Sequence, residues 1–135
     1  MGTQSWIAID GLSFDLVSLR PNPVTKNAKA IITLNVPRPY AEGNDFPGVD
    51  FGIRVRNLET NEEHTIAEGG FTYESKTPES TARCPTTVVG SIRMDNLKNT
   101  VGIYGMWRAV KRPGDSSCFG HIDSLCSISA VVSEA

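Results

Sequence analysis

The sequence predicts an all-β domain, folded as an antiparallel β-sandwich of the jelly-roll or immunoglobulin-like kind, with a closed β-barrel as the alternative. Apolar residues recur at every second position in most segments, which is the period of a strand with one buried face. The 12 glycines and 8 prolines mark turns and disfavour a helical bundle. Roughly eight to ten short strands separated by turns are typical of sandwiches and barrels. Two long connections resemble crossovers between sheets, which favours the sandwich.

Length and composition indicate one folded domain over residues 1–135. The chain has 135 residues, of which 39% are hydrophobic and 21% charged, and this balance is that of a globular protein. The formal net charge is −2. A chain this close to neutral has no overall electrostatic attraction to nucleic acid or to anionic lipid, so both are disfavoured as partners.

Two segments in the first half show the alternation most clearly. Residues 28–36 place five apolar side chains on one face, namely Ala28, Ala30, Ile32, Leu34 and Val36. Residues 49–56 place an apolar set on one face and a polar set with two arginines on the other. The inward set is Val49, Phe51, Ile53 and Val55, and the outward set is Asp50, Gly52, Arg54 and Arg56. A slip of one residue would bury both arginines, so the register is well defined.

Three later segments repeat the pattern. Residues 86–94 alternate with weaker contrast, and residues 125–132 predict a strand that holds the C-terminal part of the chain. Residues 101–110 carry bulky side chains on both faces, including Trp107 and Tyr104. We therefore expect this strand to be either central to the fold or covered on its outer side by a partner.

Glycine and proline predict the connections. Asp10-Gly11 splits residues 6–19 into a short hairpin or marks a bulge in a bent strand, and Gly69-Gly70 predicts a tight hairpin. Pro113-Gly114 suits a type II turn. Residues 37–47 and 75–85 are expected to be long and irregular, and helical character is confined to residues 95–99.

The termini and cysteines indicate a cytoplasmic protein or a subunit of an assembled particle. The N-terminal residues lack the basic and apolar regions of a signal peptide, and no apolar run approaches the ~20 residues of a membrane helix. The three cysteines are too few and odd in number for a disulfide framework. We therefore expect a reducing compartment.

No catalytic constellation, cofactor motif or assigned binding residue emerges from the sequence. Cys118 and His121 would point to opposite faces of a strand, which disfavours a catalytic pair. Cys84, Cys118, His121 and Cys126 contain the ligand types of a zinc site, but the leading Cys-x-x-Cys pair of a zinc knuckle is missing. Buried thiols, or a disulfide between Cys118 and Cys126, are the alternatives. We expect no bound metal.

The leading functional hypothesis is a non-enzymatic module that self-associates, as a subunit of a homo-oligomer, filament or particle. The two-sided strand at residues 101–110 and an uneven charge distribution support it. The middle of the chain is acidic, through Glu59, Glu62, Glu63, Glu68, Glu74 and Glu79, and the later part is basic, through Arg93, Lys98, Arg108, Lys111 and Arg112.

Three other functions compete with self-association. A carbohydrate-binding, lectin-like domain would use Tyr40, with Tyr73 or Tyr104, to stack on sugar. A small β-barrel carrier or enzyme would need a deep cavity lined by His64 or His121. An RNA-binding face would combine an outward tyrosine, Tyr104, with outward arginines, and the acidity of the chain weighs against it. Those arginines are Arg54, Arg56, Arg93 and Arg108.

Overall fold

The computed structural model describes residues 6–16, 29–43, 46–58, 60–74, 83–93, 101–110, 118–122 and 125–133. These residues form nine strands and no helix. The strands are β1 (Ile7–Leu16), β2 (Lys29–Val36), β3 (Pro39–Gly43), β4 (Gly48–Asn57), β5 (Glu63–Thr72), β6 (Thr86–Arg93), β7 (Val101–Val110), β8 (Cys118–Ile122) and β9 (Ser127–Ser133).

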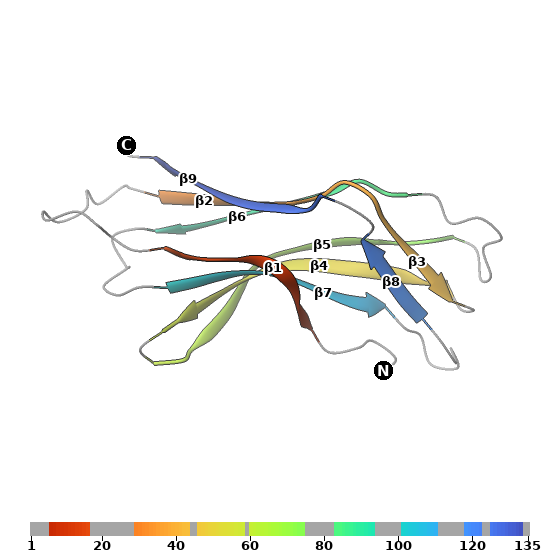
Figure 1. Cartoon of the computed structure of the whole chain (residues 1–135), viewed down its shortest axis with the longest axis horizontal. Coiled ribbons are helices and arrows are strands. Elements are labelled where there is room, and N and C mark those ends of the chain that lie inside the picture. Colours follow the sequence, from red (N-terminus) through yellow and green to blue (C-terminus); the bar gives the residue numbers. More distant parts are fainter. Residues whose placement is uncertain are drawn as a thin grey trace, which may run out of the picture.

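The strands pair in three antiparallel sheets that make a sandwich (Figure 1). One layer is a four-stranded sheet in the order β1-β7-β4-β5, and the other contains a three-stranded sheet in the order β6-β2-β9. A third pair, β3-β8, crosses one end of the molecule (Figure 1). The predicted all-β sandwich is confirmed, and the described strands do not close into the alternative barrel.

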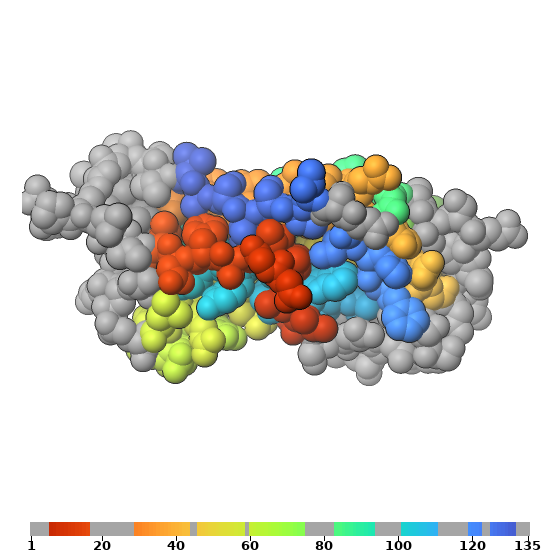
Figure 2. Space-filling view, viewed as in Figure 1, coloured from red at the N-terminus to blue at the C-terminus, as the bar shows by residue number. Residues whose placement is uncertain are grey.

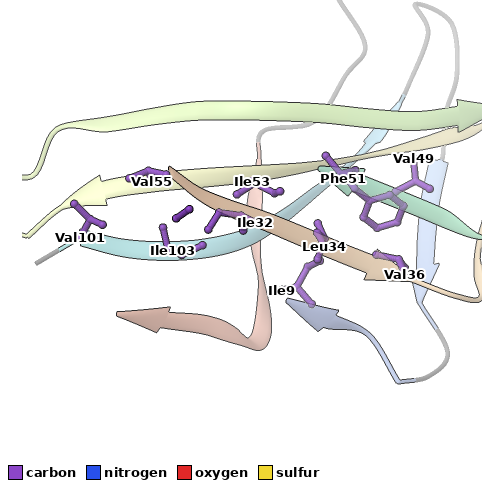
Figure 3. Close-up of a cluster of buried hydrophobic side chains, with 12 residues drawn as sticks. Ile9, Ile32, Leu34, Val36, Val49, Phe51, Ile53, Val55, Val101 and Ile103 are labelled. Carbon is purple, nitrogen blue, oxygen red and sulfur yellow. The ribbon is translucent and has the colours of Figure 1, made fainter. Parts of the chain in front are cut away.

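The core lies between the two layers and is built by the alternating residues of β2, β4 and β7 (Figure 3). The inward side chains of β2 and β4 are buried as predicted, and Phe51 is the largest of the fully buried side chains. Ile103 of β7 is also fully buried and lies beside Val55 on β4 in the strand register. Apolar burial of this kind is the main stabilising contribution to the fold.

Strand β7 is central, which explains the bulk on both of its faces. It lies between β1 and β4, and β1 crosses in front of it in Figure 2. Its outer side is covered within the chain: the Tyr104 ring lies over Gly102, and the Trp6 ring lies over Gly52 of the neighbouring strand. Trp6 lies on this outer face, with the Arg108 guanidinium 4.2 Å from its ring centroid.

The first strand is continuous but bent. β1 pairs with β7 on both sides of a register shift between Ala8 and Ser13, and Gly11 has a φ of 78° within the shifted segment. Of the two predicted alternatives, the bulged strand is therefore correct and the hairpin is wrong. Glycine fits here because it adopts positive φ without a steric penalty.

The hairpin predicted at Gly69-Gly70 is wrong, because both glycines lie inside β5. In the strand, these glycines are needed for the space that a missing side chain leaves and not for a turn. A Cβ on Gly70 would approach the Asp50 Cα to 2.8 Å, and a Cβ on Gly69 would lie 3.3 Å from the Val88 Cγ2 on the opposite layer. The glycines thus permit close approach of backbones and layers, which is the other reason for glycine in a strand.

The connection predicted over residues 37–47 is shorter than expected, because it contains β3. Pro39 can begin this strand because its missing N–H falls where no ladder bond is needed. Residues 95–99 and the Pro113-Gly114 turn lie outside the described residues, as does most of 75–85. Within the described part of the chain, no helix has the length and apolar character to cross a membrane.

Candidate functional site

The outward side of the β3-β8 pair gathers the most varied side chains of the described surface. The register places Tyr40 opposite His121 and Glu42 opposite Phe119. Since side chains alternate along a strand, these four share one face, while Pro39 and Ala41 are buried on the other. We refer to Tyr40, Glu42, Arg83 and His121 as the Tyr40 cluster.

The Tyr40 ring is flanked on two sides. The His121 imidazole stacks on it with ring centroids 4.4 Å apart and an interplanar angle of 9°. The Arg83 guanidinium carbon lies 4.4 Å from the same ring centroid. His121 belongs to β8, whereas Arg83 comes from a segment bonded to the opposite edge of β3, through the Cys84 N–H and the Pro39 carbonyl at 3.0 Å. The phenol ring therefore lies between two cationic or potentially cationic groups.

A carboxylate and an exposed aromatic ring complete this surface. The Nε2 of His121 lies 3.1 Å from Oε2 of Glu42, which is a hydrogen bond when Nε2 carries hydrogen and an ion pair when the imidazole is protonated. Phe119, the cross-strand neighbour of Glu42, is 59% exposed. The His121–Glu42 pair and the exposed Phe119 ring thus lie on the same face of the two strands.

The edge of β3 that faces away from β8 forms hydrogen bonds with two other segments, one after β5 and one before β6. The Ala41 N–H points to the Tyr73 hydroxyl, which accepts it at 3.4 Å, and the Cys84 N–H donates to the Pro39 carbonyl at 3.0 Å. Arg83 Nη1 also donates to the Arg38 carbonyl at 2.9 Å. Burial is the main cause of the raised pKa of Tyr73, with the charge of Cys84 adding to it and the Ala41 bond opposing it. The site therefore rests on an edge whose backbone groups have partners.

The inner side of β8 explains how His121 is positioned. Gly120 has no side chain, and a Cβ at this position would lie 3.2 Å from Val49 Cγ2 and 3.3 Å from the Trp107 ring. Glycine therefore lets β8 pack closely against the four-stranded sheet. This close packing positions the next residue, His121, beside Tyr40 of β3.

The three tyrosines proposed for sugar stacking occupy different places. Tyr40 is in the cluster, and the Tyr73 hydroxyl supports β3 while its ring packs edge-on against Phe71. Tyr104 lies on the outer face of the four-stranded sheet. Arg54, Arg56 and Arg108 share that face, whereas Arg93 lies on β6 in the other layer.

The two histidines named for a carrier or enzyme cavity lie on different strands. His64 is exposed on β5, and His121 lies in the cluster on β8. Two shallow pockets that are lined by described residues have volumes of about 300 Å³ and 150 Å³, and a histidine lines neither of these two.

The structure separates two of the four residues considered for zinc. His121 faces outward beside Glu42, whereas Cys126 packs against the hydrophobic core, where burial raises the pKa of its thiol. The Cys118 side chain lies outside the described residues. In the described part of the chain, no group of three or more histidine, cysteine, aspartate or glutamate residues is placed to hold a metal ion.

Sequence reasoning found Tyr40 but missed Arg83, Glu42 and Phe119 as its neighbours. Glu42 alternates with buried Ala41, which is the only local signal of an outward position. Arg83 and Phe119 reach the site through pairings between segments far apart in the chain, and no local pattern encodes these.

A comparison with curated proteins finds no match. The family described as Bc2l-C, N-terminal domain, matches residues 1–131, which is nearly the whole chain and includes every strand up to β9. This chain therefore belongs to the Bc2l-C N-terminal domain family.

Proposed function

We propose that this chain is a carbohydrate-binding domain and that the Tyr40 cluster, with Phe119 beside it, is its sugar site. Membership of a β-rich, lectin-type family supports carbohydrate as the ligand class. This was the second of the functional hypotheses drawn from the sequence, and it now takes precedence over self-association.

The observation that carries the proposal is the convergence of three kinds of group on one exposed strand pair. A sugar ring presents hydroxyl groups that both donate and accept, and an apolar face of C–H groups. Arg83 and His121 supply N–H donors, Glu42 supplies carboxylate oxygens, and Phe119 offers a ring face that is largely open to solvent. Tyr40 serves a different purpose from the one predicted, since it holds Arg83 and His121 in place rather than stacking on the ligand.

The test is glycan binding by the full chain, first on an array of neutral and acidic glycans and then by calorimetry with the best ligand. Arg83→Gln and Glu42→Gln each remove one charge-assisted hydrogen-bonding group, so each is expected to weaken binding at least tenfold. Phe119→Ala should weaken binding through loss of the stacking surface.

Matched controls lie away from the cluster on exposed strand positions. Arg93→Gln on β6 and Glu68→Gln on β5 make the same chemical changes and should leave the affinity unchanged. Absence of any glycan ligand would refute the proposal. So would wild-type affinity in both Arg83→Gln and Glu42→Gln.

We propose self-association as a second function, because one sheet face carries an exposed apolar patch. Ile31, Val89 and Val131 lie on the outer side of the β6-β2-β9 sheet, and Ile31 is the direct register partner of Val131. Clustered apolar side chains on a monomer surface are typical of contacts with another protein. Light scattering during size-exclusion chromatography should show an oligomer that Val131→Asp dissociates, and a stable monomer at high concentration would refute this function.

A further inference from the structure

The outer face of the four-stranded sheet carries a second, chemically different pocket. In the strand register, Met106 of β7 lies opposite both Ala8 of β1 and Gly52 of β4. The next outward position pairs Tyr104 with Arg54. A pocket of about 150 Å³ lies here, lined by Ala8, Arg54, Arg56, Glu63, Tyr104 and Met106. It belongs to a different layer from the Tyr40 cluster, so it is a separate site.

The apolar part of this pocket is well ordered by its surroundings. Met106 is only 7% exposed and forms a floor with Ala8. The Tyr104 ring lies close against Gly102, since a Cβ at Gly102 would be 2.8 Å from the Tyr104 Cε2 and hydroxyl oxygen. The pocket therefore offers an aromatic wall and a thioether floor, which suit the body of a small ring.

The polar part of the pocket carries an excess of positive charge. Arg54 Nη1 lies 3.3 Å from Glu63 Oε2, and Arg56 Nη2 donates to the Asn61 Oδ1 at 3.2 Å. Glu63 is the only acidic residue among those that line the pocket, so one carboxylate faces two guanidinium groups. The charge balance favours an anionic ligand.

One guanidinium atom is left without an acceptor. The Nε of Arg56 is buried and has no hydrogen-bond partner in the part of the chain that the structure describes. Its nearest carboxylate oxygen, Glu63 Oε1, is 3.7 Å away, which is close enough for electrostatic attraction but too long for a hydrogen bond. A buried donor without an acceptor costs free energy. Because Nε is closed to solvent, the Arg56 guanidinium has to turn toward the pocket before a ligand oxygen can accept its hydrogen bond.

We propose that this pocket binds a carboxylate carried on a single six-membered ring. The carboxylate accepts hydrogen bonds from Arg56 Nε and from the Arg54 guanidinium, and the ring lies between Tyr104 and Met106. An enclosed cavity of roughly 150 Å³ holds one benzene-sized ring, so this open pocket has room for the body of one such ring. Sugar acids and non-sugar ring acids share this chemistry.

The experiment is a titration of the ¹⁵N-labelled full chain, followed through the Nε–H resonance of Arg56. The probes are glucuronate and cyclohexanecarboxylate, with glucose, cyclohexanol and acetate as counterparts that lack the charge or the ring. We expect at least one ring carboxylate to shift the Arg56 resonance. Binding of glucuronate alone identifies a sugar acid, and binding of cyclohexanecarboxylate alone identifies a non-sugar acid.

Two variants test the geometry. Arg56→Lys keeps the charge but removes the Nε donor, and Arg54→Gln removes the second guanidinium. Each should weaken binding at least tenfold, whereas Arg93→Gln should not change it. If Arg56→Lys fails to fold, Arg54→Gln still provides the test.

The inference is overturned if neither ring carboxylate shifts the resonance, if the uncharged counterparts bind equally well, or if folded Arg56→Lys and Arg54→Gln both retain the affinity. This site and the proposed glycan site are tested independently. Arg83→Gln should leave ring-carboxylate binding unchanged, and Arg54→Gln should leave neutral glycan binding unchanged.

Discussion

The two adjacent glycines of β5 should respond in opposite ways to the same substitution. Gly70→Ala places a methyl group 2.8 Å from the Asp50 Cα and closer still to the Val49 carbonyl oxygen, both of which belong to the backbone of β4. Gly69→Ala places its methyl group 3.3 Å from the tip of the Val88 side chain. The backbone of β4 is hydrogen-bonded to strands on both sides, so it shifts less readily than the methyl group of a side chain.

The size of the effect follows from these distances. Ordinary contact begins at 3.4 Å, so β5 must move away from β4 by about half an ångström or more to admit the Gly70 methyl group. Overpacking of this kind costs about 1–3 kcal/mol, and each weakened ladder hydrogen bond costs about 1 kcal/mol. We expect Gly70→Ala to lower the free energy of unfolding by about 2–4 kcal/mol. Gly69→Ala should change it by less than about 1 kcal/mol, because the reduced entropy of the unfolded chain offsets the tighter contact.

Urea denaturation and thermal melting at one protein concentration measure both variants. For a chain of 135 residues, 1 kcal/mol corresponds to about 3–4 °C in Tm, so Gly70→Ala should melt roughly 7–14 °C below the wild type. Equal stability of the two variants would refute the argument, since it would mean that β4 and β5 do not approach each other as the structure describes.

Three further changes have defined outcomes. Phe51→Ala empties the largest fully buried position and should cost about 3–5 kcal/mol in urea denaturation, and a loss below 1 kcal/mol would contradict its core placement. Because burial raises the pKa of Tyr73 above its ordinary value near 10, the unfolded chain releases this proton first as the pH rises. Stability should therefore fall above about pH 10, less steeply in Tyr73→Phe, and equal slopes in a series of melts would exclude this cause. Gly120→Val should push β8 outward and abolish the proposed glycan binding at a cost of about 1–3 kcal/mol in stability, and retained affinity would show that the depth of β8 does not position His121.

The sequence predicted the strands whose two faces differ most in polarity. In β2 and β4, the inward apolar residues alternate with more exposed ones, except at Gly52, which the Trp6 ring covers. Period two therefore identifies both the strand and its buried face. Glycine was harder to interpret because it permits both positive φ and close approach. Gly11 uses the first property and Gly70 the second, and the neighbouring residues do not distinguish them.

The candidate site was predictable only in part, for a physical reason. Tyr40 attracted attention as an aromatic residue in a proline-rich segment, but its partners are set by strand pairing. Pairing of β3 with β8 depends on the whole sandwich, and the bond between the Cys84 N–H and the Pro39 carbonyl depends on where the chain returns after β5. These long-range choices are decided by core packing and have no local signature.

The strand order also has a kinetic consequence for the Tyr40 cluster. Among the described strands, only the β4-β5 pairing joins neighbours in the chain, and every other pairing closes a longer loop. Folds dominated by such non-local pairings typically reach the native state in milliseconds to seconds, because loop-closure entropy is lost before the contacts form. The cluster needs Tyr40, Arg83 and His121 together, so it cannot exist before β8 has been synthesised and has joined β3. Ligand binding at this site would therefore report that β8 has paired with β3.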